Sequence, residues 1–488
     1  MSKRITIDPI TRLEGHGKID ILLDDQGMVE RAYFQVPEFR GFEKFAEGRA
    51  VEEMPTLTQK ICGVCPTAHH TVSSKTLDAL FKVDPPPAAQ KIRELMYTAF
   101  MFEDHVLHFC FLGGPDFVVG PGASKSERNI LGVMKKLGVE VGKRVIDIRK
   151  RVRGINALIG GSPLSPVCGL PGGVSRRLSE DDREGIQSVV KDTREFAQFL
   201  LKLWEDLVLK NKVYMDLITL DMYRHQTYYM GMVDKNDRVN FYDGSIRVVD
   251  PEGDEFARFD AKDYLEHLEE RVEPWSFMKL LYLKKVGWKG FVDGKESGIY
   301  RVAPLARLNV ASGMATPLAQ AEYERMYDTL GGKPAHSTLA YHWARLIEVL
   351  YAAERMDELV RDPEITDPKV RNIPEQAPVE GIAAVEAPRG TLFHHYTTDE
   401  RGIIQKANLL VATQNNGAAI CMSIEKTARG LIKDGEVSEG FLNMIEMAFR
   451  AYDPCLACAT HSLLGEMPLK VGIYDRAGNL IRMVGRDS

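Results

Sequence analysis

Two pairs of cysteines near opposite ends of the chain constrain its fold more than any other feature of the sequence. Cys62 and Cys65 form the first pair and Cys455 and Cys458 the second, with two residues between the members of each pair. Two thiolates at this spacing can bind one metal ion from a single turn, because soft sulfur ligands suit several transition metals. Four sulfurs are enough to close a tetrahedral site or to hold two metals through shared sulfurs. The pairs can act together only if the fold brings both ends of the chain into contact.

Spacing alone leaves three kinds of cysteine site open: a structural zinc site, a pair of redox thiols, and a catalytic metal bound by thiolates. A zinc ribbon usually keeps its pairs within about 15–20 residues of each other, whereas a thioredoxin-like site needs only one pair. The other three cysteines, Cys110, Cys168 and Cys421, lie among apolar or small neighbours and are expected to be core thiols. An odd total of seven, in a chain without an export signal, argues against a disulfide framework.

Composition places the chain among ordinary globular proteins. Of its 488 residues 44% are hydrophobic and 27% are charged, and its length suggests roughly two to four domains. The net charge of −6 gives no electrostatic basis for a nucleic-acid partner. No run approaches the roughly 20 apolar residues that a membrane-spanning helix needs, and residues 1–6 lack the apolar stretch of a signal peptide. We therefore expect a cytoplasmic protein with no direct membrane span and no nucleic-acid partner.

Hydrophobic periodicity predicts an α+β fold, with a central bundle of long helices and small sheets at its periphery. Strands at 18–23 and 29–36 should form a hairpin around the turn Asp24–Gly27. Ser179–Asp182 has the pattern of a capping box and should begin one of the long helices. Helices are expected at 88–112, 127–155, 179–211, 316–360 and 418–450, and strands within 236–303 and 380–412.

The same patterns divide the chain into five regions. Residues 1–84 combine strands and loops with the first cysteine pair, and 85–235 form the central helical bundle. An α+β insert is expected at 236–303, followed at 304–461 by a region of helices and loops with the second cysteine pair. Residues 462–488 are expected to be a C-terminal extension.

Five short segments, in this order along the chain, resemble the large, catalytic subunit of a cytoplasmic nickel–iron hydrogenase. They are Thr11–His16 (TRLEGH), Arg40–Glu43 (RGFE), Ile61–Cys65 (ICGVC), Glu386–Gly390 (EAPRG) and Asp453–His461 (DPCLACATH). Any one segment is weak alone, whereas five in order are specific. Residues 36–43 and 446–453 are most similar to the group that works with heterodisulfide reductase and reduces methyl viologen, ahead of the NAD-linked group.

The resemblance implies an enzyme that cleaves hydrogen reversibly and heterolytically into protons and electrons. Hydrogen is too weakly acidic for a side-chain base to split unaided, so a metal is needed. By the resemblance, Cys62 and Cys455 are terminal nickel ligands. Cys65 and Cys458 bridge nickel to an iron that carries one carbonyl and two cyanide ligands.

Side chains around this centre receive roles from the same resemblance. Glu14 is the expected proton acceptor beyond the sulfur of Cys455, because a glutamate beside a thiolate in a dry pocket should have a raised pKa. Thr413 would donate a hydrogen bond to a cyanide, and His69 would donate to a bridging sulfur. The plainer alternatives are a Glu14 carboxylate paired with Arg12 and a His69 that is only a core histidine.

Arg389 follows Pro388 in a loop that contains glycine, and the resemblance places its guanidinium over the metals. The carboxylates of Asp104 and Asp453 would hold it there, so that its permanent charge stabilises cyanide or assists proton capture. An ordinary buried Arg–Asp bridge is the alternative, and both descriptions can hold together.

A second metal position is implied by Glu43, His461 and the backbone carbonyl of Leu409. Carboxylate and water ligands suit magnesium, whereas histidine is an unusual magnesium ligand. The expected ion is therefore magnesium or a similar divalent cation.

Two features depart from the family pattern. Ser165 stands where a histidine is expected ahead of Gly172 and Gly173, which places in doubt a residue between the active site and the electron-transfer partner. The chain also continues past His461, and residues 462–488 resemble an extension that a maturation protease removes once nickel is loaded.

Outside the two cysteine pairs the sequence has no iron–sulfur spacing, no phosphate-binding glycine loop and no flavin motif. We therefore expect no iron–sulfur cluster in this chain, and we expect its partner to be the iron–sulfur small subunit of a hydrogenase. A further acceptor module, of heterodisulfide reductase type or of NAD and flavin type, would take the electrons. Two other classes stay open: a non-catalytic relative such as a complex I subunit, which has lost the thiolates, and a structural zinc protein.

Overall fold

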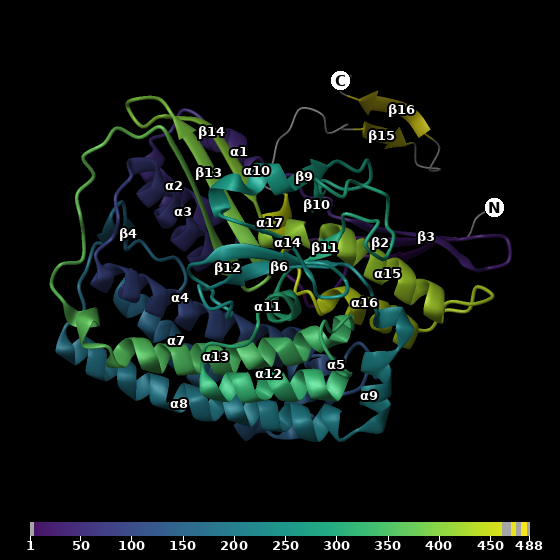
Figure 1. Ribbon diagram of the computed structural model, residues 1–488. Coiled ribbons are helices and arrows are strands. Elements are labelled where there is room, and N and C mark those ends of the chain that lie inside the picture. The colour runs from purple at the N-terminus through teal and green to yellow at the C-terminus, as the bar shows by residue number, and fades with distance from the viewer. Residues whose placement is uncertain (1–3, 461–469, 475–479, 486–488) are drawn as a thin grey trace.

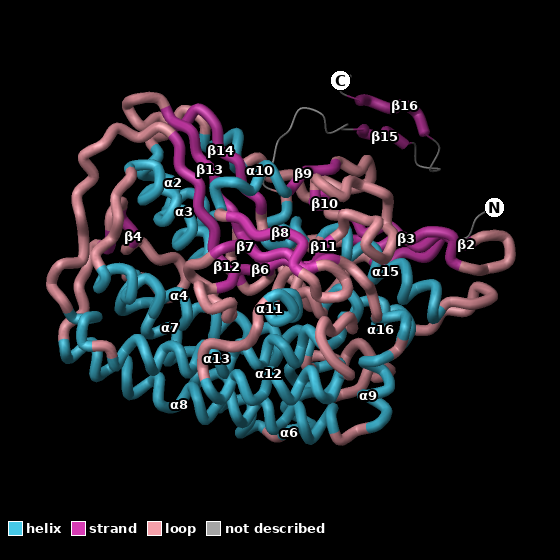
Figure 2. Tube along the Cα trace, viewed as in Figure 1, coloured by secondary structure: helices cyan, strands magenta, loops and turns pink. Residues whose placement is uncertain are grey.

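The computed structural model describes residues 4–460, 470–474 and 480–485. Long helices lie side by side along one side of the molecule, and sheets and shorter helices cover the other side (Figure 1). Figure 2 shows the same division by element type. The long helices are α4 (Pro87–Leu107), α7 (Val139–Gly160), α8 (Glu180–Trp204), α12 (Pro317–Leu330) and α13 (Tyr341–Arg361). The predicted α+β fold, a helical bundle with small sheets around it, is confirmed.

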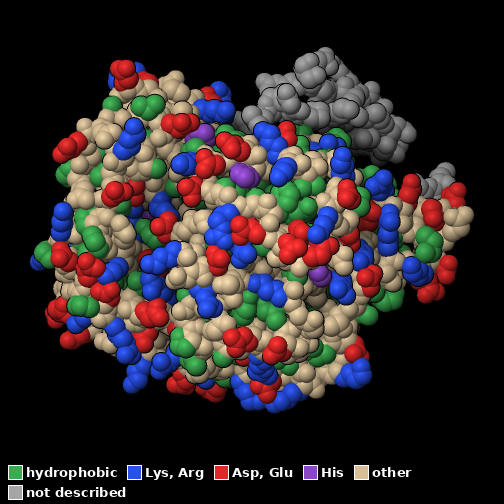
Figure 3. All heavy atoms as spheres, in the orientation of Figure 1, with side chains coloured by type: hydrophobic (Ala, Val, Ile, Leu, Met, Phe, Trp, Pro, Cys, Tyr) green, Lys and Arg blue, Asp and Glu red, His purple; other side chains and the backbone are tan. Residues whose placement is uncertain are grey.

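Helix α13 is the centre of this bundle. It contacts α4 and α8, and α4 in turn contacts α7. Almost every residue of α13 is buried, including the charged side chains of Arg345 and Glu348. No helix among the described residues is long and apolar enough to cross a bilayer. On the face seen in Figure 3, acidic and basic side chains are mixed, with no large area of a single sign.

Three of the predicted helices are each split into two. The segment 127–155 contains α6 (Ile130–Leu137) and α7, and 418–450 contains α15 (Gly417–Leu431) and α16 (Glu439–Arg450). The segment 316–360 contains α12 and α13. Each break contains residues with left-handed backbone, which an α-helix cannot accommodate: Gly138, Gly331, Gly332, Asp434 and Gly435.

The capping box at Ser179 is confirmed. The Ser179 hydroxyl accepts from the Asp182 N–H at 3.1 Å, and the Asp182 carboxylate accepts from the Ser179 N–H at 3.0 Å. Helix α8 therefore begins at Glu180, and a π-helical turn, Glu205–Leu209, continues it. A second π-helical segment, His108–Gly113, follows α4 and ends the predicted helix at 88–112.

The strands form small, mostly antiparallel sheets. The predicted N-terminal hairpin is present as β2 (Lys18–Leu23) and β3 (Val29–Gln35), and β1 (Arg4–Ile7) pairs with β2. A four-stranded sheet has the order β11 (Tyr300–Arg301), β6 (Tyr228–Val233), β7 (Ser245–Val249) and β8 (Glu255–Phe259). A three-stranded sheet has the order β12 (Glu380–Ala387), β13 (Gly390–Thr398) and β14 (Ile404–Leu410).

Shorter elements complete the fold. Three two-stranded pairs are β4–β5 (Gly169–Leu170, Gly173–Val174), β9–β10 (Leu268–Arg271, Leu280–Leu283) and β15–β16 (Lys470–Tyr474, Leu480–Gly485). The short helices are α1 (Phe42–Ala46), α2 (Met54–Leu57), α3 (Pro66–Phe81), α5 (Pro115–Val118), α9 (Lys212–Thr219), α10 (Tyr264–His267), α11 (Pro304–Val310), α14 (Ala412–Asn415) and α17 (Leu456–Ala459).

The two ends of the described chain meet inside the protein. Glu14 forms an isolated parallel bridge with Cys455, and the Leu456 N–H donates to the Glu14 carbonyl at 3.0 Å. Helix α14 contacts α17, and α3 packs against β12 and β13. The N-terminal segment, the loop before α3 and the start of α17 are thereby held together.

Candidate metal centre

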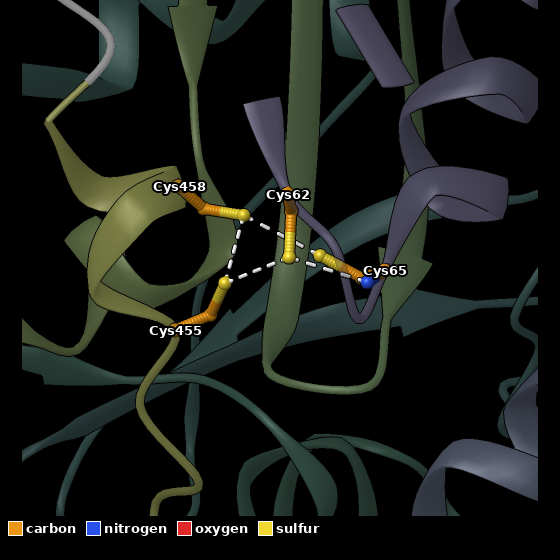
Figure 4. Close-up of side chains that lie close together, drawn as sticks. All are labelled: Cys62, Cys65, Cys455 and Cys458. Atoms are coloured by element: carbon orange, nitrogen blue, oxygen red, sulfur yellow. Dashed lines mark hydrogen bonds between the residues drawn. The ribbon is translucent and has the colours of Figure 1, made fainter. Parts of the chain in front are cut away.

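The sulfurs of the two cysteine pairs lie together in one buried place (Figure 4). The four Sγ atoms are all within 4.8 Å of one another. Cys62 Sγ lies 3.1 Å from Cys455 Sγ, and Cys65 Sγ lies 3.4 Å from Cys458 Sγ. Cys455 Sγ and Cys458 Sγ are 2.9 Å apart. A disulfide would bring two sulfurs to about 2.05 Å, so these are four separate thiol groups.

Local structure fixes the direction of the first pair. Cys62 has extended backbone after the 3₁₀ turn Thr58–Ile61, and Cys65 is the N-cap of α3, whose first residue is Pro66. The N–H groups of Val64 and Cys65 both donate to Cys62 Sγ at 3.2 Å. Backbone donors of this kind favour a thiolate at Cys62.

Charge determines what such a cluster can bind. Burial raises the pKa of Cys455 and of Cys458 well above the ordinary thiol value. Burial acts in the same direction on Cys62, but hydrogen bonds with the other three sulfurs hold the pKa of Cys62 well below that value. Like charges this close oppose one another in a dry interior, so all four sulfurs can ionise only around bound cations. The donor set therefore fits a soft, thiolate-bound metal centre such as nickel with iron.

Glu14 lies directly beside the second pair. The Cys455 thiol donates to Glu14 Oε2 at 3.0 Å, and the Ala457 N–H donates to the same oxygen at 3.1 Å. Burial, and then the charge at Cys62, raises the pKa of Glu14. Gly15 has a φ of +84°, and a Cβ there would lie 2.9 Å from the Ala457 nitrogen, so only glycine allows this close approach.

Arg12 does not pair with Glu14 as the plainer alternative supposed. Its guanidinium binds Asp116 instead, with Nη2 2.6 Å from Oδ1. The Glu14 carboxylate is consequently available to the Cys455 sulfur.

Arg389 is at the tip of the hairpin formed by β12 and β13. Ala387 pairs with Gly390, which leaves Pro388 and Arg389 as a two-residue turn. The guanidinium contacts Asp104 Oδ2 at 3.2 Å and Asp453 Oδ2 at 3.0 Å, and all three side chains are buried. The Arg389 Nε–H has no partner among the described residues. A buried donor of this kind beside the sulfurs fits an anionic group at the centre.

Two further polar side chains touch the cysteines. The Thr413 hydroxyl accepts from the Cys455 N–H at 2.9 Å, which leaves its own hydrogen to donate elsewhere. His69 Nε2 lies 3.5 Å from Cys458 Sγ, and its Nδ1 lies 3.2 Å from Nε2 of His394. His394 was not singled out from the sequence, where it reads as one of several polar residues in a strand.

The second metal position is described only in part. The carboxylate of Glu43, in α1, accepts from the Leu409 N–H of β14 at 2.7 Å, so these two residues are neighbours. His461 lies outside the described residues.

The remaining cysteines behave as core thiols. Cys168 and Cys421 are buried, and Cys168 Sγ lies 3.6 Å from the sulfur of Met96. Burial raises the pKa of Cys110 and of Cys421 to about 12, and that of Cys168 to about 11. Among the residues that the structure describes, the four paired cysteines are the one group with metal-binding geometry.

Sequence analysis missed a set of buried ionic contacts behind the site. Arg307 binds Glu348 at 2.6 Å and Glu386 at 2.8 Å, and all three side chains are fully buried. Arg345 of α13 donates to the Ala451 carbonyl at 3.0 Å. The spacing of Arg345 and Glu348 within an otherwise apolar helix was the available signal, because charged residues on a buried face require partners.

Comparison with known proteins agrees with this geometry. A family model described as nickel-dependent hydrogenase matches residues 40–130 and 295–461, and one described as HoxL-like matches residues 4–39. The chain is 48% identical to an F420-non-reducing hydrogenase subunit of Archaeoglobus profundus, over 99% of both chains. It is 40% identical to the NAD-reducing hydrogenase HoxS subunit beta of Cupriavidus necator, again over 99% of both. A crystal structure of an NAD⁺-reducing NiFe hydrogenase in the H2-reduced state is 36% identical, with a TM-score of 0.88, and the match covers 94% of this chain and 99% of that one.

The fold and the four-sulfur site define a metal-dependent oxidoreductase subunit. The chain belongs to the nickel-dependent hydrogenase family, whose model matches more than half of its residues. The predicted activity, that of the catalytic subunit of a hydrogenase, is confirmed, and the family implies a nickel–iron centre. The higher identity to an F420-non-reducing relative than to an NAD-reducing one agrees with the predicted group.

Proposed function

We propose that Cys62, Cys65, Cys455 and Cys458 hold the nickel–iron centre at which this subunit cleaves hydrogen. The observation that carries the proposal is a cluster of four buried sulfurs with a carboxylate oxygen 3.0 Å from one of them. Cys62 and Cys455 would be terminal ligands of nickel, and Cys65 and Cys458 would bridge nickel to iron. When bound, the two metals supply the Lewis-acid and electron-accepting chemistry that lets a very weak acid lose a proton.

Glu14 and Cys455 form the proposed first step of proton removal. The Cys455 sulfur takes the proton released from hydrogen, and Glu14 Oε2, at 3.0 Å, accepts it from the sulfur. A buried carboxylate whose pKa is raised binds a proton readily and releases it without a large penalty, which suits a relay.

Arg389, Pro388 and Thr413 are proposed to surround the outer side of the centre. Asp104 and Asp453 hold the Arg389 guanidinium in one orientation through contacts of 3.2 and 3.0 Å. A fixed positive charge in a buried site can stabilise anionic ligands and developing negative charge without reorganising. In this proposal iron carries one carbonyl and two cyanides, with the Thr413 hydroxyl donating to a cyanide. His69 donates to the bridging sulfur of Cys458.

A second divalent ion, magnesium or a similar cation, is proposed at Glu43, the Leu409 carbonyl and His461. Its role would be to tie the C-terminal segment to the body of the protein. Residues 462–488 are proposed to be removed by a maturation protease after nickel is loaded. The intact mass of the mature chain tests this: loss of the tail supports processing, and retention of residue 488 contradicts it.

Electrons are proposed to leave through an iron–sulfur small subunit. The described part of the chain has no metal-binding cluster beyond the four cysteines, which supports a separate carrier of iron–sulfur clusters. For the final acceptor we propose a module of heterodisulfide reductase type, because the F420-non-reducing relative is the more similar one. Subunits that co-purify with the native chain distinguish this module from an NAD and flavin module.

Metal content tests the cysteine assignment. Cys65→Ser should yield protein without nickel and without hydrogen–deuterium exchange, because the centre cannot assemble. Cys168→Ser is the matched control, since Cys168 is equally buried but lies away from the cluster beside Met96. Full nickel occupancy in Cys65→Ser, or loss of nickel in both variants, would contradict the assignment.

A further inference from the structure

The segments that carry Glu14 and Cys455 are joined by one buried carboxylate. Asp116 belongs to the short helix α5, and its side chain is only 2% exposed. Its Oδ1 accepts from Arg12 Nη2 at 2.6 Å, and its Oδ2 accepts from Arg450 Nη1 at 2.6 Å. Arg12 stands two residues before Glu14, and Arg450 is the last residue of α16, five residues before Cys455. One carboxylate thus holds both segments close to the residues that perform proton transfer.

Further contacts fix the two arginines. Arg12 Nη1 donates to the Leu112 carbonyl at 3.0 Å, and its Nη2 donates to the Asn443 carbonyl oxygen Oδ1 at 3.1 Å. Asn443 Nδ2 also donates to Asp116 Oδ1 at 3.2 Å. The Arg450 guanidinium additionally contacts Glu446. A planar guanidinium with several fixed acceptors has little freedom to move, so its backbone is held as well.

The backbone of both segments is constrained where they approach the site. Arg12 has a φ of 59° and Asp453 a φ of 58°, and each stands two residues before the functional side chain. Left-handed backbone is uncommon for a residue other than glycine, and it persists only where surrounding contacts enforce it. For Arg12 those contacts are the bonds to Asp116, Asn443 and Leu112.

Electrostatics shows why a carboxylate is needed at this position. Arg12 and Arg450 are both largely buried, with 11% and 1% of their side chains exposed. Burial, and then the positive charge of Arg450, lowers the pKa of Arg12, so the two cations oppose each other. A negative charge between them turns this repulsion into attraction for both.

We propose that Asp116 is a positioning residue for proton transfer: by holding Arg12 and Arg450 on one carboxylate, it fixes the Glu14 oxygen 3.0 Å from the Cys455 sulfur. The inference rests on the proposed role of Glu14. It differs from a purely structural ion pair, because it requires the Glu14 carboxyl to sense a change at Asp116.

The test uses the native complex with three variants and two measurements. Hydrogen–deuterium exchange reports proton transfer, and the infrared band of the protonated Glu14 carboxyl, identified by its loss in Glu14→Gln, reports the position of that group. In Asp116→Asn we expect a shifted band and exchange slowed about 100-fold at unchanged nickel content, because misplacement by about 1 Å can cost that factor. Arg12→Lys keeps the charge but loses the fork, so we expect a smaller change in both measurements.

Asp78→Asn is the matched control. Asp78 also binds a buried arginine, Arg93, at 2.5 Å, and lies twelve residues along α3 from Pro66, or ~18 Å at 1.5 Å per residue. It should lower stability and leave the band and the exchange rate as in the wild type.

An Asp116→Asn protein with wild-type band and exchange rate would overturn the inference. If this variant fails to fold, Arg12→Lys decides by the same two measurements. Wild-type exchange in Glu14→Gln would refute the role of Glu14 alone, and the band shift in Asp116→Asn would still report whether the clamp positions that carboxyl.

Discussion

Replacing Glu14 by glutamine separates proton transfer from metal binding. Glutamine has the length of glutamate, and its side-chain oxygen can still accept from the Ala457 N–H, which donates to Glu14 at 3.1 Å in the wild type. Its amide cannot take up a proton at neutral pH. Glu14 is not among the four sulfur ligands, so nickel content should be unchanged.

The size of the effect follows from the position of the carboxylate. Glu14 Oε2 lies 3.0 Å from the Cys455 sulfur, within reach for direct proton transfer. A positioned acid or base typically contributes about 10²–10⁴-fold to a reaction, and hydrogen–deuterium exchange should fall by about that factor. Glu14→Asp shortens the side chain by one methylene, so a loss of about 10²-fold is expected from misplacement alone.

The assay measures isotope exchange between hydrogen gas and heavy water by mass spectrometry, with nickel determined in the same samples. The expected result is a large loss of exchange in Glu14→Gln at full nickel occupancy. Exchange at the wild-type rate with full nickel would refute the reasoning and remove Glu14 from the proton route.

Two other predictions concern the fold around the site. His70 is buried, its Nδ1–H donates to the Pro55 carbonyl at 3.0 Å and its Nε2 accepts from the Gly169 N–H at 3.0 Å, and burial lowers the pKa of His70 to about 4. The unfolded chain therefore binds a proton below about pH 6.5 that the folded chain refuses until about pH 4, so stability on the order of 3 kcal/mol should be lost as pH falls through that window. Urea unfolding at pH 4.5 and 7 should show this loss in the wild type but not in His70→Gln, and equal pH dependence in both would contradict it. In Gly390→Ala the new Cβ would lie 2.1 Å from the Val302 side chain at a φ of +128°, so a loss of about 2–4 kcal/mol is expected, with reduced exchange; an unchanged urea midpoint would show that the turn tolerates a side chain.

Local signals in the sequence predicted local structure well. The capping box at Ser179 and the hairpin at 18–36 depend on neighbouring residues, and both are present. The helix breaks at Gly138 and at Asp434 were missed, because a single left-handed residue inside an apolar pattern leaves the periodicity almost intact. Boundaries of this kind depend on how the following helix packs rather than on the residue itself.

Long-range contacts were predictable only where five motifs occurred together. Their order along the chain indicated that the two cysteine pairs belong to one site, and the sulfurs do lie within 4.8 Å of one another. The partners of Arg12 were not predictable in the same way. Asp116 and Asn443 are separated from Arg12 by most of the fold, and no pattern in the sequence connects them. Buried ion pairs of this kind are visible only after the chain is folded, since nothing in local propensity requires them.

X-ray absorption at the nickel edge, on the purified native complex, tests the central claim most directly. The account predicts one nickel per chain with sulfur ligands, and loss of that signal in Cys65→Ser but not in Cys168→Ser. Zinc in place of nickel, or nickel surrounded by nitrogen and oxygen without sulfur, would contradict it.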